Sequence, residues 1–200
     1  MTKLANLVSV VLHPLCMPLL TLGLLLATDG YLTHRMALFS YLFVLLLINT
    51  LAPAISMFIL KKRGIISDWD IRMRRERPWP FLLVFAYYLM AYVLVVKSTA
   101  VEVPLFYRNV LLSLVVAIAF AWIVTWKIKI SMHMLAQGGI MGVYLNVAMT
   151  DQIWSLSWIS ALILSAGLVG WSRQHLGAHT SGELYLGYVL GVTSVWFTLF

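Results

Sequence analysis

Two polar side chains near the C-terminus have the spacing of a catalytic pair. The segment 172–183 contains His179 and, four residues later, Glu183, together with Arg173. Residues four apart lie on one face of a helix, so the carboxylate can hold one imidazole N–H and leave the other ring nitrogen as a nucleophile or base. Arg173 would supply a cation for an anionic substrate. The same spacing also fits a capped helix start with an ordinary His–Glu pair.

A second polar group lies in the segment 127–133. His133 opens an apolar stretch, and Ser131 precedes it by two residues. The serine hydroxyl and the backbone N–H groups of a helix N-terminus together make a natural anion site. Taken alone, such a histidine is more often a hydrogen-bonded side chain at a membrane interface.

Arginines crowd the segment 61–80. Four of them fall within six residues, and these are Arg72, Arg74, Arg75 and Arg77. Guanidinium groups pair bidentately with phosphate oxygens, so the cluster predicts a phosphate site. The competing interpretation is a stop-transfer charge cluster or a contact with anionic lipid.

The elements that must position these side chains are membrane-spanning helices. Of the 200 residues, 62% are hydrophobic and 10% are charged, and the mean hydropathy is +0.93. A soluble chain is about 45–50% apolar and about 25% charged, so a cytosolic enzyme, a secreted disulfide scaffold and a disordered tail are excluded. The single cysteine, Cys16, rules out an intramolecular disulfide and a cysteine-based metal site.

Seven apolar stretches approach or exceed the length that crosses a hydrocarbon core of about 30 Å. Helices are expected because these stretches lack the alternation of barrel strands. We predict an all-α fold, a polytopic transmembrane helix bundle that forms one domain over residues 1–200. Seven helices span the membrane, or six if the short third stretch does not. The stretches are Leu4–Ala27, Met36–Leu60, Phe81–Val96, Leu105–Trp126, Met134–Thr150, Ile153–Trp171 and Leu184–Phe200.

Prolines and glycines in these stretches carry specific expectations. Pro14, Pro18 and Pro53 should lie inside helices, where neighbouring helices satisfy the freed carbonyl groups. The glycines of the segment 138–142 should let another helix approach closely.

Charge predicts which way the chain crosses the membrane. Seven spans put the segments 61–80, 127–133 and 172–183 on the side of the N-terminus, and that side holds eleven of the fourteen Lys and Arg residues. The positive-inside rule makes this side cytoplasmic. We expect an integral multi-pass protein of a bacterial cytoplasmic membrane, with its polar loops on the cytoplasmic face. The bias falls to six against three if the cations of a binding site are left out.

The three polar segments together resemble the type-2 phosphatidic acid phosphatase superfamily. Ser172, Arg173, His179 and Glu183 match its S-R-x5-H-x3-D pattern, with glutamate in place of aspartate. The segment 130–133 resembles its P-S-G-H, and Arg77 with the following proline resembles the end of its K-x6-R-P. The segments occur in the family's order over about 110 residues. Members share an all-α fold and include integral lipid-phosphate phosphatases, soluble acid phosphatases and vanadium haloperoxidases.

The resemblance implies a role for each matching residue. His179 would attack phosphorus to form a phosphohistidine, Glu183 would orient His179, and His133 would protonate the leaving alkoxide and then activate water. Positioned cations and N–H groups would stabilise the charge on the phosphoryl oxygens. The predicted phosphate-binding residues are Arg77, Arg173, Ser131, Met132 through its backbone N–H, Arg74 and Ser172.

Three positions depart from the family pattern. Asp70 stands where the family has a lysine, Met132 where it has glycine, and Glu183 where it has aspartate. Arg72, Arg74 or Arg75 would then replace the missing cation. Met132 would narrow the site, and Glu183 lengthens the orienting arm by one methylene.

The sequence thus predicts a membrane-embedded phosphatase that hydrolyses a phosphomonoester or diphosphate on a membrane lipid. The lipid tail would lie among the helices, and no metal, cofactor or nucleic acid is expected as a partner. The alternative from another class is a weak or inactive family member that binds or transports an anionic lipid. A vanadate-dependent peroxidase is a third and more remote hypothesis for the function.

Overall fold

A computed structural model gives the fold of the chain. It describes residues 1–69, 71, 73–152 and 154–199. Asp70 and Arg72, which entered the phosphate prediction, lie outside the described residues, as do the predicted segment ends Ile153 and Phe200.

All the regular elements of the described residues are helical, which confirms the all-α prediction. Long apolar stretches satisfy their backbone groups internally only as helices. In chain order the elements are α1 (Thr2–Val11), α2 (Met17–Thr28), α3 (Gly30–Thr33), α4 (Met36–Lys62), η1 (Arg74–Glu76), α5 (Pro78–Val96), α6 (Leu105–Thr125), α7 (Met132–Thr150), α8 (Leu156–His175) and α9 (Ser181–Leu199).

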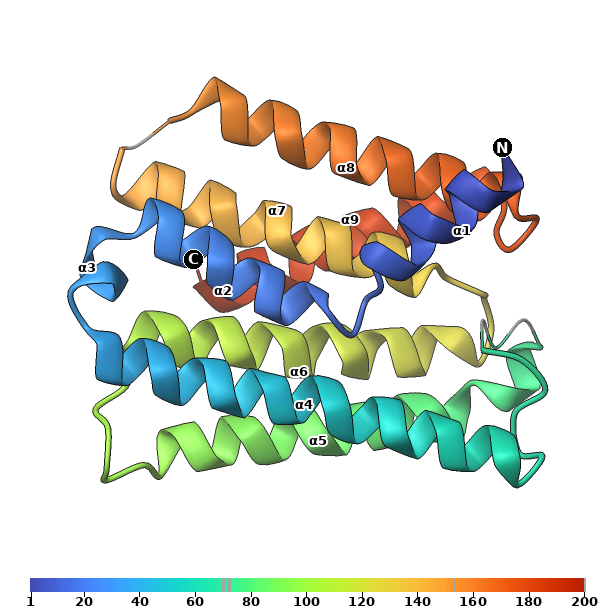
Figure 1. The fold of residues 1–200 in the computed structure, drawn as a ribbon, viewed down its shortest axis with the longest axis horizontal. Helices are drawn as coiled ribbons and strands as arrows, with labels where there is room; N and C mark the ends of the chain where they lie inside the picture. The colour runs from blue at the N-terminus through green and yellow to red at the C-terminus, as the bar shows by residue number, and fades with distance from the viewer. Residues whose placement is uncertain (70, 72, 153, 200) are drawn as a thin grey trace.

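The long helices run side by side along the longest axis of the molecule (Figure 1). In this view α8 lies along one edge and α4 and α5 along the other, with α7, α9 and α6 between them. The connections 63–77, 126–131 and 176–180 meet at the end of the bundle where the N-terminus lies, at the right of Figure 1. The three polar segments therefore come together at one end, which we call the basic end.

Within the described part of the chain, four helical segments are long and apolar enough to cross a membrane. They are Met36–Lys62, Arg74–Val96, Leu105–Thr125 and Leu156–His175. The third predicted stretch seemed short only because its helix begins earlier, at Pro78, which gives α5 a length of 19 residues. Membrane-crossing helices, the coarser part of the sequence prediction, are therefore present.

Helices α7 and α9 form the tightest contact of the bundle, because glycines line it on both sides. A Cβ atom on Gly138 would lie 2.1 Å from the Tyr188 carbonyl oxygen, and one on Gly191 would lie 2.0 Å from the Leu135 carbonyl oxygen. The predicted close approach at the glycines of segment 138–142 is confirmed. Helix α7 buries 13 of its 19 residues and is the central element of the fold.

The first predicted stretch, Leu4–Ala27, is wrong as a single helix. The chain leaves the helical conformation after Val11 and starts α2 at Met17, and Pro14 lies in the break instead of inside a helix. Proline lacks an N–H and disfavours the helical conformation of the preceding residue, so an apolar run containing His13 and Pro14 divides here. Pro18 falls in the first turn of α2, where proline is tolerated, and Pro53 lies inside α4 as expected.

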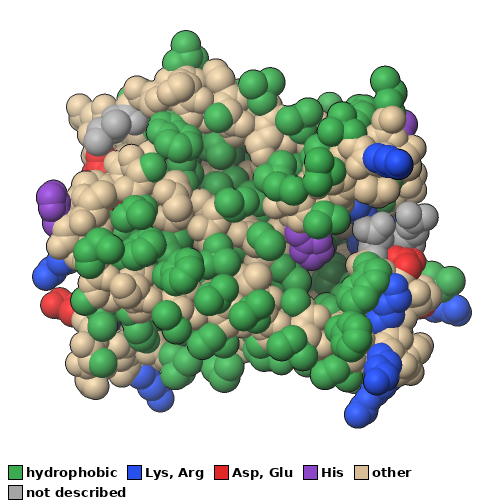
Figure 2. Space-filling view, in the orientation of Figure 1, with side chains coloured by type: hydrophobic (Ala, Val, Ile, Leu, Met, Phe, Trp, Pro, Cys, Tyr) green, Lys and Arg blue, Asp and Glu red, His purple; other side chains and the backbone are tan. Residues whose placement is uncertain are grey.

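The surface separates apolar from charged side chains along the bundle axis. Figure 2 shows hydrophobic side chains across the middle of one face, with Lys and Arg toward its two ends. Large exposed side chains such as Phe58, Leu164 and Phe197 face outward from the helices. Contiguous apolar surface of this kind fits a lipid environment.

Candidate functional site

Direct hydrogen bonds join the second and third polar segments at the basic end. The Lys129 ammonium donates to the Ala178 carbonyl oxygen at 2.6 Å, and the Ser131 backbone N–H donates to the Glu183 carbonyl oxygen at 3.2 Å. Because these bonds join positions about 50 residues apart, they fix where the N-termini of α7 and α9 lie relative to each other.

Arg77 connects the first polar segment to the second. Its Nε donates to the Ile71 carbonyl oxygen at 2.9 Å, and its Nη1 donates to the Ile130 carbonyl oxygen at 2.8 Å. The residue is only 3% exposed. Arg77 also lines the cavity described below.

His179 and Glu183 form the predicted pair. The His179 Nδ1 lies 2.8 Å from Glu183 Oε2, and the side chains are 4% and 20% exposed. Thr180 precedes the first residue of α9, and its backbone N–H and hydroxyl exchange hydrogen bonds with Glu183 at 3.3 and 3.4 Å. The carboxylate therefore caps the helix and holds the imidazole at the same time. The capped helix start with a His–Glu pair is present, and the catalytic role of the pair stays a prediction.

The surroundings of His179 keep its imidazole neutral. Burial is the largest cause and lowers the pKa of His179 to about 4; Arg77 and Lys129 act in the same direction, while Glu183 opposes them. At neutral pH the Nδ1–H therefore donates to Glu183, and the lone pair of Nε2 is available. A buried, neutral histidine with a fixed tautomer suits nucleophilic attack.

Ser131 is the N-cap of α7, and Met132 is its first residue. The Ser131 hydroxyl accepts from the Met134 backbone N–H at 3.4 Å, and the side chain is fully buried. The predicted helix N-terminus at this segment is therefore present. Met132 contributes to the wall of the cavity described below, so its side chain narrows the space in front of the helix end.

His133 and Arg173 meet a residue that the sequence did not single out, Ser9 of α1. The Arg173 Nη1 donates to the Ser9 hydroxyl at 2.6 Å, while the His133 Nε2 lies 3.2 Å from that hydroxyl and 3.0 Å from the Ser9 carbonyl oxygen. The His13 ring packs edge-on against the His133 ring at a centroid distance of 5.3 Å. Ser9 thus links the second and third polar segments to α1.

The sequence did not indicate a role for Ser9 or His13, because both residues lie within the apolar stretch Leu4–Ala27. Neither residue belongs to a recognisable pattern with the polar segments, and more than 100 residues separate them from the second and third of these segments. A local signal was the proline after His13, which disfavours a helical conformation at His13 and so indicates a break after α1.

Two predicted phosphate-binding residues donate hydrogen bonds to backbone carbonyl oxygens of the protein in this structure. The Arg74 Nη1 donates to the Lys127 carbonyl oxygen at 2.5 Å, and the Ser172 hydroxyl donates to the Ala5 carbonyl oxygen at 2.6 Å. Arg74 is exposed, whereas Ser172 is buried between α8 and α1. Neither residue lines the cavity, so their phosphate role stays a prediction.

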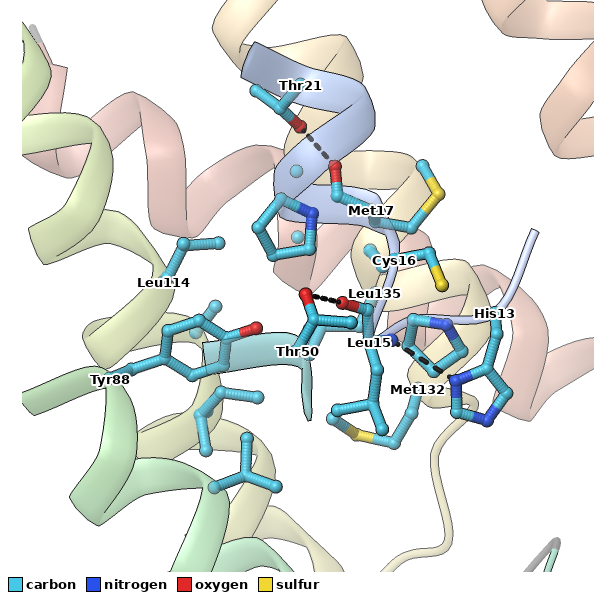
Figure 3. A pocket seen from close by; sticks show the side chains of 18 of the residues that line it. His13, Leu15, Cys16, Met17, Thr21, Thr50, Tyr88, Leu114, Met132 and Leu135 are labelled. Atoms are coloured by element: carbon cyan, nitrogen blue, oxygen red, sulfur yellow. Dashed lines mark hydrogen bonds between the residues drawn. The ribbon is translucent and has the colours of Figure 1, made fainter. Parts of the chain in front are cut away.

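A cavity of about 460 Å³ begins at the basic end and extends into the bundle. His179, His133, Arg77 and Arg173 line its polar end, together with Trp69. Figure 3 shows side chains from the α1–α2 break, α4, α5, α6 and α7 converging on it, among them Thr50, Tyr88 and Leu114. His179, His133 and both buried arginines therefore line one cavity.

Among the described residues no group of three or more His, Cys, Asp or Glu side chains could hold a metal ion. Glu183 contacts His179, and Glu76 accepts from the Ser67 backbone N–H and hydroxyl at 2.9 Å each. Comparisons of the chain with protein-family models, curated proteins and solved structures find no match.

Proposed function

We propose that the chain is a membrane-embedded lipid-phosphate phosphatase that works through a phosphohistidine, similar to the type-2 phosphatidic acid phosphatase superfamily. The observation that carries this proposal is His179, held by Glu183, at the polar end of a cavity that Arg77 and Arg173 also line. A neutral nucleophile beside two buried cations suits attack on a phosphoryl group.

In the first step the lone pair of His179 Nε2 attacks phosphorus, and the bond from phosphorus to the lipid oxygen breaks. Glu183 accepts the Nδ1 hydrogen bond and stabilises the positive charge that develops on the ring. The His133 Nε2 first leaves its contact with the Ser9 carbonyl oxygen and forms a hydrogen bond with the leaving oxygen. It then donates a proton to the departing alkoxide.

In the second step water attacks the phosphohistidine and returns His179 to its starting state. His133, now neutral, takes the proton from that water as the P–N bond breaks. Arg77 and Arg173 bind the equatorial oxygens throughout, and the backbone N–H group of Met132 lies at a helix N-terminus that favours the same negative charge.

We further infer that α7 and α9 cross the bilayer together with the four apolar helices, which gives six crossings. Helix α7 contains small and polar residues because most of its surface packs against protein, whereas α9 exposes apolar side chains such as Val189 and Phe197. Helices α1 and α2 together would supply a seventh, broken crossing, with α1 and its exposed Leu4, Leu7 and Val10 lying at the membrane interface.

The test is phosphate release by the purified protein in detergent, with phosphatidate, phosphatidylglycerophosphate, a polyprenyl diphosphate and a lipid A-type substrate. His179→Ala should abolish turnover and the acid-labile phosphoenzyme. His133→Ala should slow turnover about 10²–10⁴-fold, as loss of an acid–base group does, and should let the phosphoenzyme accumulate when the leaving group needs no protonation.

The matched control is His175→Ala. His175 lies at the end of α8 and stacks on Trp171 at 5.5 Å, so its removal should leave most of the activity. An active His179→Ala protein would refute the mechanism. Saturable binding of lipid phosphate without any phosphate release would instead identify an anionic-lipid binder.

A further inference from the structure

Ser9 lies where α1 packs on α8. Ala5 and Ser9 are four residues apart on one face of α1, and both are buried. The Ser172 hydroxyl of α8 donates to the Ala5 carbonyl oxygen and the Arg173 Nη1 donates to the Ser9 hydroxyl, each at 2.6 Å. These two bonds, from neighbouring residues of α8, hold Ser9 beside the candidate site.

The carbonyl group of Ser9 can bind a side chain because α1 ends nearby. The helix ends at Val11, and carbonyl groups in the last turn of a helix have no partner within it. The Ser9 carbonyl oxygen lies 3.0 Å from the His133 Nε2, and the Ser9 hydroxyl oxygen lies 3.2 Å from the same atom. One ring nitrogen of His133 therefore faces two oxygens of a single residue.

These two oxygens suit the two protonation states of the His133 Nε2. A carbonyl oxygen only accepts hydrogen bonds, so it pairs with Nε2 when that nitrogen carries a proton. A hydroxyl also donates, so the Ser9 side chain pairs with Nε2 when the nitrogen carries a lone pair. Arg173 takes a lone pair of the hydroxyl oxygen and leaves its hydrogen for His133. Ser9 thus offers His133 a partner before and after a proton transfer.

Ser9 reaches the site only through other side chains. The described residues that line the large cavity include His13, His133 and Arg173 but not Ser9, which lines a second cavity that shares His13 and Arg173 with the first. The His13 ring also packs edge-on against the His133 ring, so the imidazole is held at its face or edge as well as at Nε2. Ser9 therefore acts on the positions of His133 and Arg173 and not on a bound substrate.

We propose that Ser9 is a positioning residue, which holds the imidazole of His133 in both protonation states and keeps Arg173 beside it. This inference rests on the proposed function for the reaction that it serves. When water attacks the phosphohistidine, an O–P bond forms, the P–N bond breaks with its electron pair going to His179, and the water proton goes to the His133 Nε2. The Ser9 hydroxyl favours the tautomer of His133 with its proton on Nδ1, and this tautomer keeps the Nε2 lone pair for that step.

The tautomer of neutral His133 tests the contact without turnover. In Ser9→Ala only the carbonyl oxygen of residue 9 remains beside Nε2, so the neutral ring should shift toward the tautomer with its proton on Nε2. Nitrogen-15 NMR of the histidine-labelled protein in detergent, at alkaline pH, reports this shift because protonated and unprotonated ring nitrogens differ widely in chemical shift. The His133 signals are assigned by their loss in His133→Ala.

Three controls separate the contact from a general change in structure. Ser9→Thr keeps the hydroxyl and should keep the wild-type tautomer. Ser172→Ala removes another bond between α1 and α8 and should leave the His133 signals in place, whatever its effect on activity. The His179 signals in the same spectrum should be unchanged in Ser9→Ala, because Glu183 holds that ring.

Rapid-quench kinetics test the role of Ser9 in the proposed reaction. The substrate has a leaving group that needs no protonation and is used at saturation, so that weaker binding by Arg173 does not enter the comparison. Ser9→Ala should slow hydrolysis of the phosphoenzyme about tenfold, which is part of the about 10²–10⁴-fold that an acid–base group contributes. Formation of the phosphoenzyme should change much less, so the phosphoenzyme should accumulate, and Ser9→Thr should restore its hydrolysis.

A His133 tautomer that is the same in the wild type and in Ser9→Ala would overturn the proposal, and so would equal slowing of the two chemical steps. If the tautomer shifts in Ser9→Ala but the wild type releases no phosphate from any lipid, the phosphatase proposal fails and the contact of Ser9 with His133 stands. If the wild type releases phosphate and Ser9→Ala changes neither the tautomer nor the hydrolysis rate, the role of Ser9 fails and the phosphatase proposal stands.

Discussion

At the scale of single residues, the site is built from side chains that each satisfy a structural need and a chemical one. Glu183 completes the cap of α9 while it holds the Nδ1 of His179. Lys129 donates a hydrogen bond to the Ala178 carbonyl oxygen and so joins the second polar segment to the third. Its positive charge also helps to lower the pKa of the His179 imidazole. Substitution of these residues will therefore change both activity and local structure, and a useful test must separate the two.

The pH dependence of His179 provides such a test. Its pKa is lowered by burial and by the charges of Arg77 and Lys129, so the protonated, unreactive form appears only at acidic pH. Lys129→Met removes one of these charges and should raise that pKa. The acidic limb of kcat/KM should then move to higher pH, by about half a unit.

Two variants separate charge from structure. Lys129→Arg keeps the cation and should leave the acidic limb in place, whereas Lys127→Met removes a neighbouring exposed cation that does not act on His179. An acidic limb that shifts equally in Lys129→Arg and Lys129→Met would mean that the bond to Ala178, and not the charge, controls the imidazole.

At the scale of elements, the contact of α7 with α9 sets the position of both histidines. His133 lies in the first turn of α7, and His179 lies two residues before α9. Glycines let the two backbones meet, and the Ser131 carbonyl oxygen would lie 2.5 Å from a Cβ atom on Gly187. Close backbone packing of this kind leaves little freedom for the catalytic ends of the helices to move apart.

Gly191→Ala should separate these helices. Its Cβ would lie 2.0 Å from the Leu135 carbonyl oxygen and 2.8 Å from the Gly139 backbone nitrogen, which are backbone atoms that cannot turn away. We expect a loss of about 3 kcal/mol of stability, at the upper end for overpacking, seen as a lower unfolding temperature in detergent and as lost phosphate release.

Gly167→Ala is the control on the outer helix α8. A Cβ atom there would meet nothing within 4 Å, and alanine favours a helix over glycine by about 1 kcal/mol, so the unfolding temperature should stay equal or rise. Equal unfolding temperatures for the two alanine variants would contradict the assigned packing of α7 on α9.

At the scale of the whole molecule, the charge of the basic end predicts the orientation in the membrane. The three polar segments contain ten of the fourteen Lys and Arg residues, and Lys3 near the N-terminus is an eleventh on the same side. The positive-inside rule predicts that the site, and the head group it binds, face the cytoplasm.

Labelling of introduced cysteines tests this orientation in a Cys16→Ser background. Ser67→Cys, at the basic end, should resist a membrane-impermeant thiol reagent in intact cells and react in inverted vesicles. Thr99→Cys lies in the exposed connection between α5 and α6 at the opposite end and should show the reverse pattern. Labelling of Ser67→Cys in intact cells would place the site on the outer side, and the positive charges would then be explained by substrate binding.

The sequence by itself determined what depends on local spacing. Apolar length and composition predicted helices, and the proximity of His179 and Glu183 followed from positions four apart. The glycines of segment 138–142 predicted a close helix contact without naming the partner, because small residues permit approach and do not specify what approaches.

Only the tertiary structure decided which distant groups meet. Ser9 contacts His133 and Arg173 across separations of 124 and 164 residues, and no local pattern in an apolar stretch encodes such pairs. A membrane helix is apolar on every side, so hydropathy does not distinguish the surface that faces lipid from the one that lines a cavity. The break at Pro14, the bond from Ser172 to the Ala5 carbonyl oxygen and the cavity between the helices therefore depend on how the whole chain packs.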